Sequence, residues 1–168
     1  MPRILAVVAV LAWLIPLADA HAFQNEPTGF RGIPWGTPVD QVRAKKETWF
    51  NRDIGLGLTE YRSRDDLSMS GIPLTYNLYQ FYKGKFSTGI MEGYASQCGS
   101  IMGVLVARFG QPDQKLTERR FVWHGRTTNI VYICNRRQDY CRVGLESTAL
   151  LAERERDIAN DAAKGSDF

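Results

Sequence analysis

Histidine is scarce in this chain of 168 residues, which holds only His21 and His124. Two histidines argue against mechanisms that use histidine as a catalytic base or as a repeated metal ligand. The sequence also has neither the Gly-x-Ser-x-Gly motif of serine hydrolases nor the Gly-Lys-Ser/Thr motif of phosphate-binding loops. The excess of basic residues is small as well, since 21 Lys and Arg against 18 Asp and Glu give a net charge of +3. Such an excess argues against nucleic-acid binding through bulk charge.

Long apolar runs are absent except at the N-terminus. There Arg3 precedes the run Ile4–Leu17, and the small residues of Ala18-Asp19-Ala20 form the Ala-x-Ala pattern that signal peptidase reads. The run is too short and too close to the N-terminus for a good membrane span. We therefore expect residues 1–20 to be a signal peptide.

The rest of the chain, residues 21–168, is then expected to be a single exported domain, periplasmic or secreted, with no integral membrane segment after cleavage. A second Ala-x-Ala, Ala20-His21-Ala22, leaves two cleavage sites open. The mature protein starts at His21 in one case and at Phe23 in the other.

Cysteine is limited to Cys98, Cys134 and Cys141, with no Cys-x-x-Cys pair and no zinc-like spacing. Cys134 ends a strand-like run and Cys141 begins the next one. Placing these two opposite each other also pairs Tyr132 with Val143 and Ile130 with Leu145, so one register joins the sulfurs and aligns the apolar partners. This agreement predicts a disulfide between Cys134 and Cys141.

Cys98 is left over by that pairing and falls in the first turn of a predicted helix. We expect it to be a small buried residue with a free thiol. The alternative is a thiol acidified by the helix N-terminus.

Apolar periodicity predicts the same unit twice, over about 29–94 and 96–147, with a C-terminal helix over about 149–163. Each unit is one helix followed by three strands, which gives an α+β fold with antiparallel sheet packed by helices. The predicted elements are a helix ending near Lys46, strands at 57–61, 74–82 and 86–94, a helix at 96–109, and strands at 117–124, 127–134 and 140–147. Thr37 with Asp40 predicts a capping box for the first helix, and Gly110 with Pro112 predicts the end of the second.

Two short motifs carry a family resemblance. Trp35-Gly36-Thr37-Pro38 with Val42, and Phe109-Gly110-Gln111-Pro112, resemble the helix signatures of small exported α/β proteins of the BamE-like (SmpA) and β-lactamase-inhibitor-protein-like superfamily. The lipidation cysteine of the BamE-like proteins is absent here. The resemblance implies a non-enzymatic envelope protein that docks onto other proteins.

Positive charge is concentrated between Lys115 and Arg142. This segment contains seven Lys and Arg but only two acidic residues, Glu118 and Asp139. Guanidinium groups interspersed with aromatic rings suit a protein interface or anionic headgroups. The predicted binding residues are Arg120, Trp123, Arg126, Arg136, Arg137 and Tyr140.

The sequence thus predicts an exported binding or adaptor protein without enzymatic activity and without a cofactor, whose partner is an envelope protein or an anionic surface. One alternative is a periplasmic copper-binding protein, in which an N-terminal His21 and the imidazole of His124 supply three nitrogen ligands. The other is an enzyme of an unrecognised type.

Overall fold

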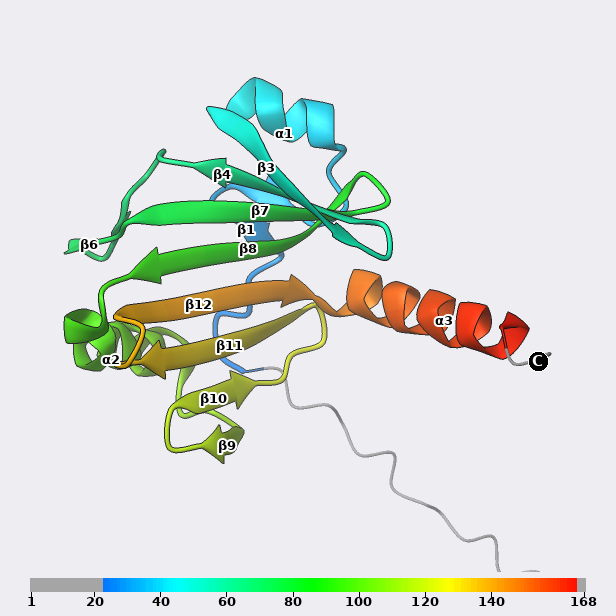
Figure 1. Ribbon diagram of the computed structural model, residues 1–168. Coiled ribbons are helices and arrows are strands. Elements are labelled where there is room, and N and C mark those ends of the chain that lie inside the picture. Colours follow the sequence, from blue (N-terminus) through cyan, green and yellow to red (C-terminus); the bar gives the residue numbers. More distant parts are fainter. Residues whose placement is uncertain (1–22, 166–168) are drawn as a thin grey trace, which may run out of the picture.

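An eight-stranded antiparallel sheet dominates residues 23–165, the part of the chain that the computed structural model describes (Figure 1). Its strands are β3 (Thr48–Gly55), β4 (Leu58–Ser63), β7 (Tyr76–Tyr82), β8 (Lys85–Gly93), β9 (Gln114–Thr117), β10 (Arg120–Trp123), β11 (Thr128–Asn135) and β12 (Tyr140–Ser147). There are also two short hairpins, β1–β2 (Gly29–Phe30 and Ile33–Pro34) and β5–β6 (Ser68–Met69 and Ile72–Pro73). The helical elements are the 3-10 turn η1 (Ala95–Gln97) and the helices α1 (Val39–Lys45), α2 (Cys98–Phe109) and α3 (Thr148–Lys164). The predicted signal peptide lies outside the described residues.

The expected α+β fold, two helix-plus-three-strand units packed by helices, is wrong. Strands outweigh helices in the described residues, and each half adds four strands to one shared sheet in the order β3-β4-β7-β8-β12-β11-β10-β9. The two halves meet where β8 pairs with β12. The strands without a predicted counterpart, β3 and β9, are the two edges, and their mostly exposed residues show no alternation between buried and exposed.

The hydrophobic core lies on one side of the sheet, which we call the back face. It is covered by α1, α2 and the β1–β2 hairpin, which contribute Phe30, Ile33, Val42, Ile101, Leu105 and Phe109 to a single buried cluster. The ring of Phe30 packs directly on Gly89 of β8, where a Cβ atom would lie 2.1 Å from Cγ of Phe30. The absence of a side chain at Gly89 therefore allows the hairpin to approach the sheet.

The opposite side, the front face, has no helix over its middle in residues 23–165, and Figure 1 shows the sheet from this side. Leu78, Ile90 and Val122 are buried here but stand apart from the main core cluster. Helix α3 leaves the end of β12 and is anchored at one end of this face, where Asp157 accepts hydrogen bonds from the Tyr82 hydroxyl and from Lys83 Nζ.

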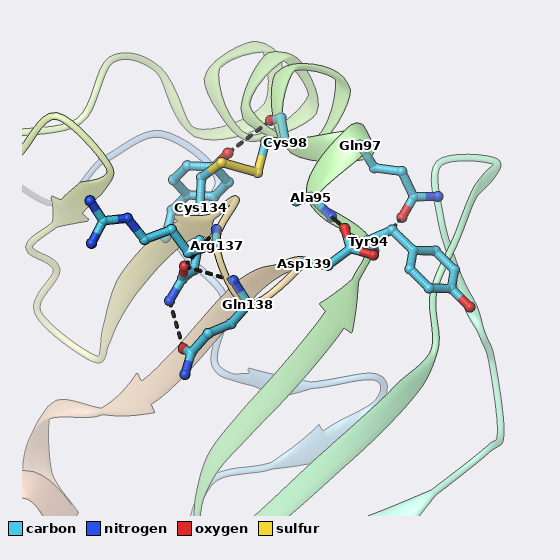
Figure 2. Close-up of a disulfide and its surroundings, with 10 residues drawn as sticks. Tyr94, Ala95, Gln97, Cys98, Cys134, Arg137, Gln138 and Asp139 are labelled. Atoms are coloured by element: carbon cyan, nitrogen blue, oxygen red, sulfur yellow. Dashed lines mark hydrogen bonds between the residues drawn. A yellow bond between two sulfur atoms is a disulfide. The ribbon is translucent and has the colours of Figure 1, made fainter.

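The disulfide joins Cys98 at the start of α2 to Cys134 at the end of β11, with 5.8 Å between the Cα atoms (Figure 2). The predicted Cys134–Cys141 bond is therefore wrong, and so is the prediction that Cys98 is a free thiol. The predicted register is nevertheless confirmed, because Cys134 pairs with Cys141, Tyr132 with Val143 and Ile130 with Leu145. Cys141 is buried and free, and burial raises the pKa of its thiol to about 11.

The helix ends were predicted with mixed success. Gly110 ends α2 with a φ of +84°, as expected for glycine after a helix. The capping box at α1 is wrong, because Pro38 is the N-cap residue and the hydroxyl of Thr37 donates a hydrogen bond to the carbonyl of Pro34. Within residues 23–165, no helix has the length and apolar character needed to cross a membrane.

Candidate functional site

The predicted basic patch does not form a single surface. Trp123 is fully buried in the core and its Nε1 donates a hydrogen bond to the carbonyl of Gly110, so it is a core residue and was wrongly assigned to binding. Arg126 lies in the loop before β11, whereas Arg136 and Arg137 lie in the loop after it. The eight-residue strand between them spans about 26 Å, which separates these charges.

The remaining predicted residues, Arg120 on β10 and Tyr140 on β12, lie on the front face on either side of β11. Arg120 pairs with Ile133 of β11, and Ile133 pairs with Arg142 of β12. The guanidinium carbon of Arg142 lies 4.9 Å from the centre of the Tyr140 ring. Arg142 was not among the predicted site residues, although it belongs to the same basic stretch.

Arg142 is part of a continuous row of contacts that crosses four strands. The guanidinium of Arg62 on β4 stacks 4.1 Å above the ring of Tyr76 on β7. The Tyr76 hydroxyl donates a hydrogen bond to Glu92 on β8, and Glu92 accepts a 2.9 Å hydrogen bond from Nε of Arg142 on β12. We call this row, Arg62, Tyr76, Glu92, Arg142 and Tyr140, the Arg–Tyr ladder.

The ladder is electrostatically coupled through Glu92. Burial raises the pKa of Tyr76, and the hydrogen bond to Glu92 raises it further, so the hydroxyl stays protonated. Burial lowers the pKa of Arg142, but the ion pair with Glu92 outweighs this and the net direction is upward. Tyr76 therefore stays neutral and Arg142 stays cationic at neutral pH.

The ladder ends near the edge of the sheet at Arg62. Nε of Arg62 is buried and has no hydrogen-bond partner in the described residues. Across the edge pair, Arg62 faces Trp49 of β3, whose side chain is 41% exposed. Trp49 extends the row of arginine and aromatic residues to the edge of the sheet.

The surroundings of the ladder carry an excess of positive charge. The acids on this face are each engaged with protein groups. Glu92 pairs with Arg142, Glu60 pairs with Arg52, Glu146 interacts with Arg154 and Arg120, and Asp139 accepts a hydrogen bond from the backbone of Ala95 (Figure 2). The arginines of the ladder and its neighbourhood are Arg62, Arg120, Arg136, Arg137 and Arg142. An acidic surface is therefore the complementary partner.

The copper hypothesis is untested, because His21 lies outside the described residues. His124 is exposed, and its Nε2 lies 3.4 Å from the side-chain oxygen of Gln114. Between residues 23 and 165, no group of three or more His, Cys, Asp or Glu side chains is arranged to hold a metal ion.

Sequence reasoning missed most of the ladder because its members are spread over the chain. Arg62, Tyr76 and Glu92 lie in the first half and Arg142 in the second, and they meet only because β8 pairs with β12. Alternation within β7 and β8 places Tyr76 and Glu92 on the same face, but the order of strands was needed to bring them to Arg142.

Comparison with known proteins found no matching family model, no matching characterised protein and no matching solved structure.

Proposed function

We propose that this chain is an exported, non-enzymatic binding protein that docks through its front face onto an acidic surface of another envelope protein. The observation that carries the proposal is the Arg–Tyr ladder, a prearranged row of arginine and aromatic side chains on the part of the front face that lies beyond helix α3. Arginine, tyrosine and tryptophan are the residue types that contribute most at protein interfaces.

The rigidity of the ladder supports a role in binding, because side chains that are already held in place lose little entropy when a partner binds. Arg142 is held on both sides, by the Glu92 carboxylate and by the Tyr140 ring, so it loses little side-chain freedom when a partner arrives. Arg62 is stacked on Tyr76, which fixes the plane of a guanidinium that can pair with a carboxylate of a partner.

The proposed location rests on two observations. The first is the leader pattern of residues 1–20. The second is the disulfide between Cys98 and Cys134, which is a stable bond in oxidising compartments and rare in the cytoplasm.

Site-specific photocrosslinking in the native envelope tests the proposal. A photoreactive amino acid replaces Trp49, next to the ladder, or Lys45, an exposed residue of α1, as the control position. The proposal expects one protein to be crosslinked from position 49 and not from position 45, and it expects the Arg62→Glu substitution to abolish that crosslink.

The variant Arg62→Glu is preferred over a change at Arg142, because removing Arg142 would leave Glu92 without its ion pair. Lys45→Glu is the matched charge reversal, and it should leave the crosslink intact. Crosslinks to lipid or polysaccharide alone would favour the anionic envelope component, and equal crosslinking from both positions would overturn the proposal.

A further inference from the structure

A cavity of about 510 Å³ lies on the back face, at the seam between the two halves of the chain. Its floor is formed by Met91 of β8 and Leu145 of β12, the two central strands. Its walls are the β1–β2 hairpin, the β5–β6 hairpin and the C-terminal end of α2. The volume falls within the range of about 300–1,000 Å³ that is typical of small-molecule sites.

Apolar and polar atoms share the surface of this cavity almost equally. Its lining includes six hydrophobic side chains that are each at most 9% exposed: Phe30, Ile33, Met91, Leu105, Phe109 and Leu145. This apolar half of the lining favours an aliphatic or aromatic group on the ligand, because burying apolar surface stabilises the complex by about 25 cal/mol per Å².

Two arginines, Arg31 and Arg108, also line the cavity, and none of its lining residues is acidic. Nη2 of Arg31 donates a 2.8 Å hydrogen bond to the carbonyl of Ser68 and thereby links the two hairpins, while its Nε is buried without a partner in the described residues. Arg108 lies over the Phe109 ring and forms no ion pair within residues 23–165. The cavity therefore combines apolar walls with two cationic groups.

A nearby acid does not neutralise these groups. Asp66 is the carboxylate that interacts with Arg31, but it accepts a 2.6 Å hydrogen bond from Lys46 and is engaged in that ion pair. Burial lowers the pKa of Arg31, which means that its charge is poorly solvated. A ligand anion would supply the missing interaction with the guanidinium.

We propose that this cavity binds an aliphatic carboxylate, with the chain between Met91, Leu105 and Leu145 and the carboxylate on Arg31 and Arg108. The apolar lining selects the chain and the two guanidinium groups select the anion. This site lies on the opposite side of the sheet from the Arg–Tyr ladder, so the inference does not depend on the proposed docking function.

The first test titrates dodecanoate into the purified protein and measures binding by calorimetry. The dodecanoate concentration is kept in the range where dodecanoate is monomeric. The variant Arg31→Asn removes the guanidinium but keeps the two-residue turn, because Asn-Gly favours the positive φ values of Arg31 and Gly32. Arg108→Gln removes the second cation from the end of α2. Each is expected to weaken binding about tenfold or more, the effect of losing one hydrogen bond to a charged group.

Two controls test the roles of charge and position. Arg137→Gln, in the loop on the far side of β11, should leave dodecanoate binding unchanged. Dodecan-1-ol, which has the same chain and no charge, should bind more weakly than dodecanoate and be insensitive to Arg31→Asn. Equal affinity of the protein for dodecanoate and dodecylammonium would overturn the proposal, since two arginines disfavour a cation.

Methyl NMR of methionine locates the ligand independently of affinity. Met69 and Met91 line the cavity, whereas Met102 of α2 does not. Saturable shifts of the Met69 and Met91 methyl signals, with Met102 unmoved, are the expected result. Shifts at Met102 alone, or no saturable shift at any of the three, would overturn the proposal, and this readout remains valid if one of the arginine variants folds poorly.

Discussion

Cys134 and Cys141 lie directly opposite each other on β11 and β12, yet the sulfur of Cys134 is bonded to Cys98 of α2. The bond therefore fastens the helix to the sheet instead of joining two strands that are already paired by hydrogen bonds. The third thiol, Cys141, stays protonated because burial raises its pKa to about 11. It is a poor nucleophile for disulfide exchange at neutral pH.

We expect Cys98→Ser to lower the free energy of unfolding by about 4 kcal/mol, because the bond closes a loop with a sequence separation of 36 residues. Cys141→Ala should cost about 1 kcal/mol, since it removes one small buried group. Chemical denaturation with and without reductant measures both effects. Reductant should destabilise the wild type and Cys141→Ala but leave the double variant Cys98→Ser/Cys141→Ala, which keeps only Cys134, unchanged.

The same variants test which bond forms. In Cys98→Ser, Cys134 is left facing Cys141, so peptide mapping under oxidising conditions is expected to recover the Cys134–Cys141 bond that the strand register permits. Finding that bond in the wild-type protein would contradict the structure.

The contact between Gly89 and Phe30 gives a second prediction. A methyl group at Gly89 would lie 2.1 Å from the ring of Phe30, so Gly89→Ala must displace the β1–β2 hairpin. We expect a loss of about 1–3 kcal/mol in thermal or chemical unfolding, the usual cost of overpacking a core.

Gly144→Ala is the matched control for this substitution. Gly144 lies on the neighbouring central strand β12, and a Cβ atom there would be 4.0 Å from its nearest neighbours. This variant should retain the stability of the wild type or exceed it slightly, because alanine restricts the unfolded chain more than glycine. An equal loss in both variants would mean that strand propensity, and not the Phe30 contact, explains the effect.

The sequence predicted local structure better than the arrangement of the sheet. The register of β11 and β12 followed from two requirements that agree, the pairing of Cys134 with Cys141 and of Ile130 with Leu145. The edge strand β3 had no such signal, because its residues are almost all exposed and irregularities interrupt its pairing with β4. The correct disulfide depended on where α2 packs, which periodicity within one helix does not specify.

The candidate site was predictable only in part for the same reason. Arg120 and Tyr140 remain predicted binding residues, and charge and aromatic content alone did not distinguish them from Trp123, which is buried. Burial of a tryptophan depends on the face of the strand on which it lies. Assigning that face to Trp123 required the packing of β10 against α2 and its Gly110 end.

Glu26 links the N-terminal segment to the loop before β11. Its Oε1 accepts hydrogen bonds from the backbone N–H of Thr127 and Thr128, at 2.6 and 2.8 Å, and from the hydroxyl of Thr127. Burial alone would raise the pKa of Glu26, but these hydrogen bonds outweigh it and lower the pKa below the ordinary value of 4.5. The stabilisation is therefore present above pH 4.5 and is lost as the pH falls through the lowered value.

Glu26→Gln is expected to cost about 1–2 kcal/mol at pH 7, because the hydrogen bonds lose their charged acceptor. The difference from the wild type should shrink as the pH is lowered below 4.5, where the wild-type carboxyl becomes protonated. Glu118→Gln, at a side chain that is 85% exposed, provides the control and should change stability little. Denaturant unfolding at a series of pH values gives both curves, and a difference that is constant with pH would contradict the role assigned to Glu26.

Glu146 shows the opposite behaviour, because it lies on the front face of β12 where burial raises its pKa above the ordinary 4.5, against the opposing effects of Arg154 and Arg120. The folded protein thus holds this proton more tightly than the unfolded chain, and the resulting stabilisation is present below pH 4.5 and lost as the pH rises through the raised value.

Glu146→Gln removes the poorly solvated charge, so the variant should gain stability relative to the wild type between pH 4 and pH 7. The exposed Glu155 of α3 provides the control, since Glu155→Gln removes the same charge without a burial effect. If Glu146→Gln instead lost stability relative to the wild type as the pH rose, the carboxylate would be stabilised by the two arginines more than it is destabilised by burial.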